Sequence, residues 1–342
     1  MVGLAIPKNL TDSQRDCDSL QLRRGRSTLR EKFHQHAPDI QKRAGRCGCS
    51  IRSVPMRVLV LGGDGMLGHQ LLRQLGAHHE VHATLRRESK AYDSFGLFDA
   101  KRTYFGVDAC SPERLQQIMA ACRPETVINA IGVVKQRAEA NDAIQSLEIN
   151  ALLPQRLAVL CEAAGARLIH FSTDCVFSGR RGKYRETDVP DAEDLYGRAK
   201  YLGEPGGKQC VTLRTSFIGR ELTRKTGLLE WFLAQRGTIR GYTKAIFSGF
   251  TTLEMTRITR KVLAAPALSG VYHVSSEPIS KLDLLTMIRD ALGLTTEIEP
   301  YDELQCDRSL DSSRFREALA YLPPGWNAMV EELAQDIRGA GR

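Results

Sequence analysis

A tyrosine and a lysine four positions apart, Tyr196 and Lys200 in the segment YGRAK, are the residues best suited to catalysis. Side chains at i and i+4 of a helix lie on one face. A lysine ammonium beside a phenol stabilises the phenolate, so we expect the pKa of Tyr196 to fall from about 10 toward neutrality. The phenol would then serve as a proton donor to a substrate carbonyl. Because YxxxK also occurs on solvated helix faces, the pair needs support from other elements.

Thr173 gives that support. It directly follows the predicted strand 167–172, which reads RLIHFS. Ligands of open α/β sheets bind at the carboxyl ends of the strands. Thr173 is therefore expected to hydrogen-bond the same substrate oxygen as Tyr196.

A glycine-rich turn near the start of the fold is the predicted cofactor site. The apolar run 58–61 predicts a strand, which is followed by Gly62, Gly65 and Gly68 and then by a segment with helical apolar spacing. Glycines let a backbone approach a pyrophosphate, and the helix N-terminus offers free N–H groups to hold it. The spacing GxxGxxG differs from the commoner GxGxxG, and glycines also simply form turns, so the pattern alone is weak.

The second predicted strand, 80–85, is followed at once by Arg86 and Arg87. In a dinucleotide-binding fold this point meets the adenosine ribose, where an acid binds the 2′-hydroxyl and an arginine suits a 2′-phosphate. The two arginines favour NADPH, while the nearby Glu88 keeps NADH as an alternative.

Strands and helices alternate along the rest of the chain, which predicts a parallel sheet covered on both faces. The expected fold class is α/β, a Rossmann-type doubly wound sheet with a smaller C-terminal substrate-binding lobe. The cofactor domain is expected to comprise residues 56–220 and about 250–278, and the lobe about 221–249 and 279–342. Further strands are predicted at 103–107, 126–131, 210–214 and 271–274. Helices are predicted from Ser111 and over 141–164 (interrupted or kinked at Pro154), 221–237, 251–264 and 280–292.

Residues 1–55 differ from the rest in charge. They carry eleven Lys and Arg against five acids, a net charge of +6, which leaves only +2 of the chain's +8 for the remainder. We expect a basic, disordered extension, with the functional chain starting at Met56; a basic targeting peptide is the alternative. The remainder gives little reason to expect nucleic acid as a partner. His34, His36, Cys47 and Cys49 lack familiar zinc spacing, so no metal is expected.

The cysteines and the hydropathy suggest where the protein works. Nine cysteines at irregular spacings indicate reduced thiols in a cytoplasmic protein rather than a disulfide framework. The sequence lacks an apolar run of the roughly 18 residues that a membrane span requires.

Five motifs together resemble one family. GGDGMLG, NAIG, FSTDCVFSG, YGRAK and LRTSFIG occur in the order seen in extended short-chain dehydrogenases/reductases, and the chain from about Met56 onward is most similar to the dTDP-4-dehydrorhamnose reductase family. The resemblance implies an NADP-dependent reductase of the 4-keto group of a nucleotide-linked deoxy sugar, in dTDP-rhamnose and surface polysaccharide biosynthesis. Tyr196 would be the general acid, Lys200 would orient the nicotinamide ribose, and Thr173 would take the usual Ser/Thr place.

The resemblance also implies binding residues. The cofactor would be held by residues of the glycine turn and of two later segments, with Asp108 at the adenine: Gly62, Gly65, Met66, Leu67, Gly68, Arg86, Arg87, Asp108, Asn129, Ala130, Gly132, Tyr196 and Lys200. The substrate would meet Asp174, Cys175, Phe217 and Arg308. Arg308 would pair with a diphosphate; as an alternative it is an ordinary surface arginine.

Two departures from the family pattern leave the sugar open. Cys175 stands where the family usually has tyrosine, and Phe217 where tryptophan is common. Cys175 is expected to be a small buried filler rather than a nucleophile, because its neighbourhood in sequence lacks a histidine.

Other functions also fit the resemblance. One alternative is a non-catalytic NADP-binding protein like the regulatory subunit of methionine adenosyltransferase; another is a sugar-nucleotide epimerase or dehydratase. The sequence leaves the oligomeric state open; in a homodimer, the helices 142–164 and 195–202 could pair across the interface.

Overall fold

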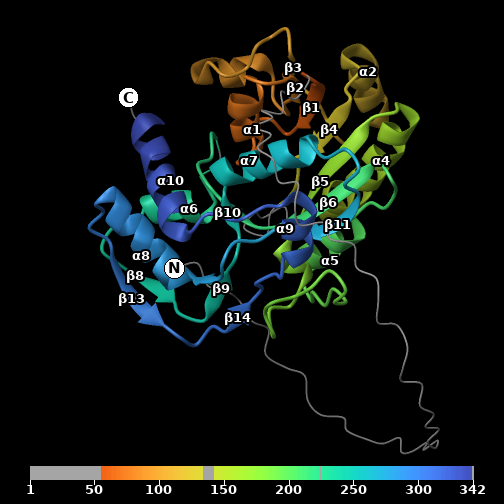
Figure 1. Cartoon of the computed structure of the whole chain (residues 1–342). Helices are drawn as coiled ribbons and strands as arrows, with labels where there is room; N and C mark the ends of the chain where they lie inside the picture. Colours follow the sequence, from red (N-terminus) through yellow and green to blue (C-terminus); the bar gives the residue numbers. More distant parts are fainter. Residues whose placement is uncertain (1–54, 134–141, 224, 341–342) are drawn as a thin grey trace, which may run out of the picture. The chain divides into compact units, whose positions relative to one another are not determined.

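The computed structural model describes residues 55–133, 142–223 and 225–340 of the 342-residue chain, and these belong to one compact unit (Figure 1). The predictions for residues 1–54, including the histidines and cysteines considered as metal ligands, lie outside the described residues. The division of the remainder into two lobes stays a prediction.

The main element is a seven-stranded sheet in the order β11-β6-β5-β4-β1-β2-β3, with every neighbouring pair parallel. The order reverses between β1 and β4, which is the switch point where open α/β sheets bind ligands. The strands are β1 (Arg57–Leu61), β2 (Glu80–Thr84), β3 (Thr103–Tyr104), β4 (Thr126–Asn129), β5 (Arg167–Thr173), β6 (Cys210–Thr215) and β11 (Gly270–His273).

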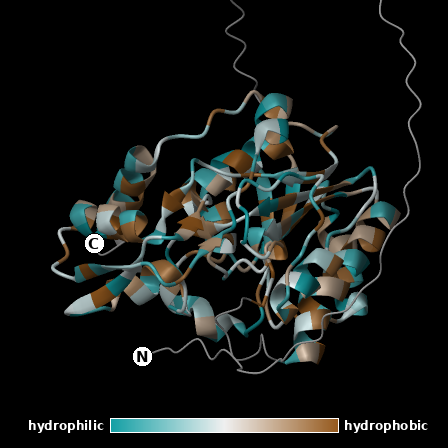
Figure 2. Cartoon of the chain, turned by 90° about the horizontal axis from the view of Figure 1, so that it is seen from below, coloured by the Kyte–Doolittle hydropathy of each residue, from teal (hydrophilic) through white to brown (hydrophobic). Residues whose placement is uncertain are grey.

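The central strand β1 feeds two separate cores, because successive side chains of a strand point to opposite faces. Val58 and Val60 pack with α1 (Gly68–Leu75) and α7 (Thr252–Leu263), whereas Leu59 and Leu61 pack with α2 (Pro112–Cys122) and α4 (Leu153–Ala163). In Figure 2 the main strands are largely brown, and the helices carry both brown and teal residues. Helices on both faces confirm the predicted doubly wound α/β class.

The C-terminal part adds small sheets and helices beside this frame. Their pairings are β10–β7, β12–β9–β14 and β13–β8. The strands are β7 (Phe217–Ile218), β8 (Thr238–Tyr242), β9 (Ala245–Phe247), β10 (Phe250–Thr251), β12 (Ile279–Ser280), β13 (Glu297–Tyr301) and β14 (Cys306–Asp307), and the helices are α6 (Leu228–Leu233), α8 (Lys281–Leu292), α9 (Ser313–Leu319) and α10 (Trp326–Ala340).

The helix predicted over 221–237 is wrong in extent, since only α6 forms. Before α6, two carboxylates accept backbone N–H groups in place of helical hydrogen bonds. Glu221 accepts the N–H groups of Thr226 and Gly227, and Glu230 accepts the N–H of Glu221. Gly237, in the left-handed region at φ +73°, lies beyond the helix end.

The helix predicted over 141–164 is interrupted, but not by a kink at Pro154. It consists of α3 (Ala143–Leu147), the π-turn η3 (Glu148–Leu152) and α4. Pro154 lies in the first turn of α4, where its missing N–H costs little. Helix α5 (Leu195–Leu202) and the 3₁₀ turns η1 (Ser89–Phe95), within a segment predicted as loop, and η4 (Asp174–Val176) complete the elements.

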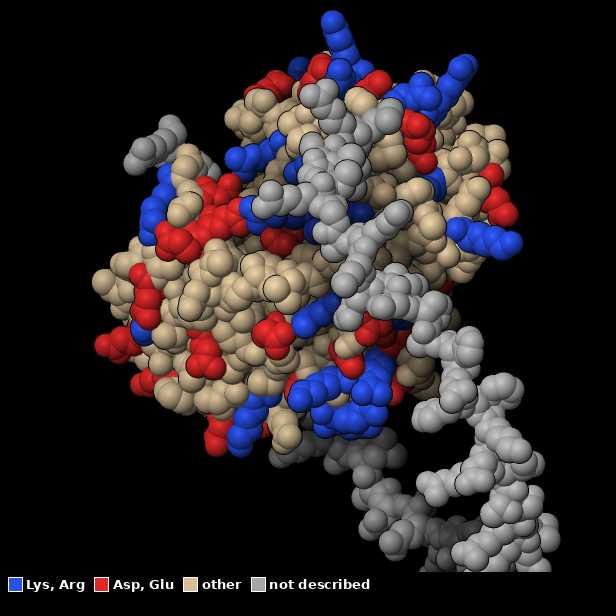
Figure 3. All heavy atoms as spheres, in the orientation of Figure 1, with Lys and Arg blue, Asp and Glu red and all other residues tan. Residues whose placement is uncertain are grey.

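The surface and composition of the described part agree with a weakly charged body. Basic and acidic side chains are interspersed on the face shown in Figure 3. Among the helices that the structure describes, none is long and apolar enough to cross a membrane. The described ranges also hold no cluster of three or more His, Cys, Asp or Glu suited to a metal ion.

Candidate active site

The glycine turn after β1 is closely packed on both sides. Gly62 is left-handed at φ +79°, and a Cβ there would lie 2.8 Å from Ile131 Cγ1, just beyond β4. A Cβ on Gly68 would lie 2.0 Å from the Gly62 carbonyl oxygen, so the first turn of α1 rests directly on the loop. These two glycines bring the start of α1 to the switch point between β1 and β4.

The turn fits a phosphate-bearing group. The N–H groups of Met66 and Leu67 immediately precede α1 and have no hydrogen-bond partner among the described residues. Free N–H groups at a helix N-terminus are suited to anions. Met66 also reaches the C-terminal part, since a Cβ on Gly227 would lie 2.6 Å from its Cε. The residues of this turn can therefore hold a dinucleotide pyrophosphate.

The predicted adenosine end is open to solvent. Arg86 and Arg87, just after β2, are exposed, and so is Asp108 beyond β3. The Asp108 carboxylate accepts the N–H of Cys110 at 2.9 Å, which fixes its local turn. Exposed guanidinium groups at this place are available to a 2′-phosphate.

Asn129 does not offer its side chain to a ligand, because it is fully buried at the end of β4. Its amide lies 3.1 Å from His170 Nδ1 on β5, and its carbonyl oxygen accepts the N–H of Ile131. Its side chain thus shapes the turn, and the contact of Asn129 with the cofactor stays a prediction. Ala130 and Gly132 are partly exposed and can form the predicted wall.

Thr173 and Tyr196 are brought together at the carboxyl end of β5. Thr173 Oγ1 accepts the N–H of Cys175 and donates to Asp174 Oδ1, and the Tyr196 phenol lies beside it. Helix α5 starts at an Asp194 cap and packs so closely that a Cβ on Gly197 would lie 2.3 Å from the Cys175 carbonyl oxygen. The predicted catalytic threonine and tyrosine therefore lie next to each other.

The expected lowering of the Tyr196 pKa is wrong for this structure. Burial raises the pKa of Tyr196, with the nearby Cys175 adding to the rise and the Thr173 hydrogen bond opposing it. Lys200, the expected cause of a lowered value, instead donates from Nζ to the Phe171 carbonyl oxygen at 2.7 Å and is itself buried. Burial lowers the pKa of Lys200 to about 8. At neutral pH the phenol is protonated and the lysine is largely charged.

Three of the predicted substrate residues gather beside Thr173. Asp174 is buried, and burial raises its pKa while the charge of Arg308 opposes the rise. Burial also raises the pKa of Cys175 to about 12, so its thiol is neutral and unsuited to act as a nucleophile. Arg308 is half-buried and donates from Nε to the Phe177 carbonyl oxygen at 2.7 Å, so it is not an ordinary surface arginine.

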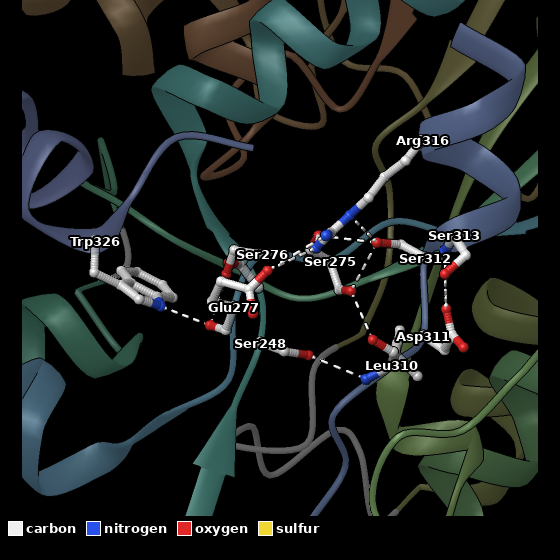
Figure 4. A network of polar contacts seen from close by, with 11 residues as sticks. Ser248, Ser275, Ser276, Glu277, Leu310, Asp311, Ser312, Ser313, Arg316 and Trp326 are labelled. Carbon is white, nitrogen blue, oxygen red and sulfur yellow. Dashed lines mark hydrogen bonds and ion pairs between the residues drawn. The ribbon is translucent and has the colours of Figure 1, made fainter. Parts of the chain in front are cut away.

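The segment that carries Arg308 is tied to the end of β11 by serines (Figure 4). Ser275 Oγ donates to the Leu310 carbonyl oxygen at 2.7 Å, and Ser312 Oγ donates to the Ser275 carbonyl oxygen at 3.1 Å. Trp326 Nε1 donates to the Glu277 carbonyl oxygen nearby. This network holds the C-terminal chain against the edge of the sheet where the candidate site lies.

Phe217 lies on β7, directly beyond β6, and is partly exposed. Its ring packs edge-to-face on Phe171, with the centroids 6.5 Å apart. Phe171 is also the residue whose carbonyl oxygen binds Lys200, so Phe217 is connected to the predicted catalytic helix through one β5 residue.

Two supporting side chains were missed in the sequence. Glu204, four residues after Lys200, accepts two hydrogen bonds from Arg214 (2.8 and 2.7 Å) and one from Ser172, all nearly buried, and so fastens the end of α5 to β5 and β6. Glu204 lies beyond the end of α5 at Leu202, so helical spacing does not identify it. Asn150, in the π-turn, bonds both the N–H and the carbonyl of Val133 at 3.0 Å. The local sequence carries no signal for that contact.

Comparisons with known proteins agree with this architecture. The family described as RmlD substrate binding domain matches residues 56–338. The chain is 27% identical over 236 residues to the dTDP-4-dehydrorhamnose reductase of Burkholderia thailandensis, covering 65% of this chain and 73% of that protein. It is 31% identical over 254 residues to the methionine adenosyltransferase 2 subunit beta of Pongo abelii, covering 70% and 72%.

A solved structure gives the same fold. The dTDP-4-dehydrorhamnose reductase of Bacillus anthracis in complex with NADP superposes with a TM-score of 0.69 at 21% identity, covering 83% of this chain and all of that one. At this identity the likeness shows the fold alone. The family match over residues 56–338 covers well over half of the chain, so the chain belongs to the RmlD substrate binding domain family, among the extended short-chain dehydrogenases/reductases that resemble dTDP-4-dehydrorhamnose reductase.

Proposed function

We propose that the chain is an NADPH-dependent reductase of the 4-keto group of a nucleotide-linked deoxy sugar. The observation that carries the proposal is the meeting of Thr173, Tyr196 and Lys200 at the carboxyl end of β5, on the sheet edge that also carries the glycine turn. The reductase from Burkholderia thailandensis supports the reaction class, and the NADP complex of the Bacillus anthracis protein supports the cofactor.

The protein's own residues would handle the proton. Bound NADPH would supply the hydride. Tyr196, protonated in its buried position, would donate its phenolic proton to the carbonyl oxygen that becomes the new hydroxyl. Thr173 would hydrogen-bond the same oxygen, and the charge on Lys200 would favour the phenolate left behind.

The substrate side would be formed by Asp174, Cys175, Phe217 and Arg308. The Arg308 guanidinium, half-buried and held by the Phe177 carbonyl, is placed to pair with a diphosphate. A role in dTDP-rhamnose and surface polysaccharide biosynthesis, a cytoplasmic location and a homodimeric state are parts of the same proposal.

Replacing Tyr196 tests the mechanism. Tyr196→Phe should lower the NADPH-dependent turnover of a 4-keto sugar nucleotide by roughly 100-fold or more, because general acid catalysis is worth about that much. NADPH affinity should change little. Loss of nicotinamide absorbance measures the first quantity and fluorescence titration the second.

Tyr201 provides a matched control, since it lies on the same helix and is 44% exposed. Tyr201→Phe should retain wild-type turnover. Undiminished turnover in Tyr196→Phe would refute the assigned mechanism.

A second candidate is a non-catalytic NADP-binding protein, favoured by the 31% identity to the methionine adenosyltransferase 2 subunit beta. Binding of NADPH by the wild-type chain without turnover of any member of a panel of 4-keto sugar nucleotides would support this candidate. Turnover of one member would support the reductase.

A further inference from the structure

One buried tyrosine that the proposed mechanism does not use lies between the two predicted ends of the cofactor site. Tyr92, in η1, is 2% exposed. Its hydroxyl donates to Asp64 Oδ2 at 2.9 Å, and Asp64 belongs to the glycine turn. The same hydroxyl accepts the N–H of Arg87 at 3.2 Å. A single oxygen atom thus bridges the turn and the arginine pair.

The tyrosine ring is fixed by aromatic neighbours. Phe98 meets it edge-on with the centroids 5.2 Å apart, and Phe95 and Phe105 lie at 6.5 and 6.2 Å. Burial is the main cause that raises the pKa of Tyr92 to about 12, so the hydroxyl keeps its proton and remains a donor to Asp64.

The backbone of Arg87 is held at both of its polar groups. Its N–H is bound by Tyr92, and its carbonyl oxygen accepts the N–H of Gly106 at 3.0 Å. The glycine turn is in turn bound to the end of β2, because Thr84 accepts the N–H groups of Gly62 and Gly63. The guanidinium groups of Arg86 and Arg87 remain exposed on this fixed backbone.

We propose that Tyr92 is a positioning residue that sets the preference for a 2′-phosphorylated dinucleotide, by fixing the arginine pair relative to the glycine turn. A dinucleotide that binds the turn through its pyrophosphate presents its 2′ position at a set distance from that turn. The bridge keeps the arginines at that distance. The Tyr92 hydroxyl also donates a hydrogen bond to the Asp64 carboxylate, and the negative charge of that carboxylate would repel an anion in the turn. The inference rests on the proposed binding of NADPH.

The test compares NADPH and NADH affinities of the full-length chain by fluorescence titration. Tyr92→Phe keeps the ring and removes the bridge. We expect the Kd for NADPH to rise about fivefold, which corresponds to about 1 kcal/mol, the typical net worth of a hydrogen bond, and the Kd for NADH to stay unchanged. In a background with Arg86→Ala and Arg87→Ala, Tyr92→Phe should have no further effect on NADPH, because coupled residues are not additive.

Tyr104→Phe is the matched control, since Tyr104 lies on the adjacent strand β3 and contacts His82 rather than Arg87. It should leave both affinities unchanged. If Tyr92→Phe fails to fold, Asp64→Ala removes the Tyr92–Asp64 hydrogen bond from a partly exposed position. Loss of the Asp64 charge acts on both dinucleotides alike, so the ratio of NADPH affinity to NADH affinity should still fall.

Equal weakening of NADPH and NADH, or no change in their ratio, would overturn the inference and leave the proposed reductase intact. Failure of the wild-type chain to bind either dinucleotide would overturn both.

Discussion

At the scale of single residues, the main cost in the candidate site is the buried Lys200 charge. The pKa of Lys200 is lowered by burial to about 8, below the 10.5 of an exposed lysine. Between about pH 8 and pH 10.5, Lys200 keeps its proton in the unfolded chain and loses it in the folded one. The free energy of unfolding should therefore rise with pH over this range.

Lys200→Met isolates this effect. Between pH 8 and 10.5 the free energy of unfolding of the wild type should rise relative to that of Lys200→Met, by roughly 3 kcal/mol. Loss of the hydrogen bond to Phe171 adds an offset that does not depend on pH. Urea unfolding at several pH values measures the difference, and a difference that stays flat above pH 8 would contradict the assigned titration.

The sequence predicted which residues form the candidate site better than it predicted their hydrogen-bond partners and pKa values. The spacing of Tyr196 and Lys200 identified a pair on one helix, but not that Lys200 binds the Phe171 carbonyl oxygen or that burial raises the pKa of Tyr196. Those states depend on β5, which lies about 30 residues earlier in the chain. Desolvation is set by tertiary packing, which a local pattern does not contain.

At the scale of elements, the contact between α1 and the glycine turn leaves no room for a side chain at Gly68. Gly68→Ala would place a methyl group 2.0 Å from the Gly62 carbonyl oxygen, so α1 must shift away from β1. We expect a loss of about 3 kcal/mol of stability and loss of dinucleotide binding. Thermal unfolding and NADPH titration measure the two effects.

Gly206→Ala is the corresponding control, because a Cβ there meets nothing within 4 Å. Its stability should stay within about 0.5 kcal/mol of the wild type. Equal melting temperatures for the two variants would show that α1 tolerates the displacement.

The predictions of element type were correct where a local apolar period decided the structure, and they failed where side-chain hydrogen bonds to the backbone replaced the helical ones or where a contact from another segment intervened. The helices α7 and α8 begin and end within a residue or two of their predicted bounds, at Thr251 and Ser280 caps. The segment 221–227 is held as a loop by the carboxylates of Glu221 and Glu230 instead. The π-turn at Asn150 depends on the backbone of Val133, outside the helix itself.

At the scale of the whole molecule, apolar side chains remain exposed on the helices predicted to pair in a dimer. Ile144 on α3, Val159 on α4 and Leu202 at the end of α5 are 77%, 67% and 60% exposed. Gln155 of α4 donates to the Leu202 carbonyl oxygen, so α4 and α5 are neighbours. We expect a dimer through this face.

Ile144→Glu combined with Leu202→Lys should convert the dimer to a monomer, because charges would be buried in the apolar contact. Sedimentation equilibrium measures the mass, and the exposed Val189→Glu, on the loop before α5, serves as control. A monomeric wild type would contradict the prediction.

The bond from Arg308 to the Phe177 carbonyl joins residues 131 positions apart. During synthesis at about 5–20 residues per second, Arg308 leaves the ribosome roughly 7 to 26 seconds after Phe177. During that interval the strands β1 to β5 have already been synthesised, while Arg308 and the serine ties around it have not. Under the proposed function, the nascent chain would form its dinucleotide turn before its sugar-nucleotide side, and premature termination would leave the turn without the substrate side.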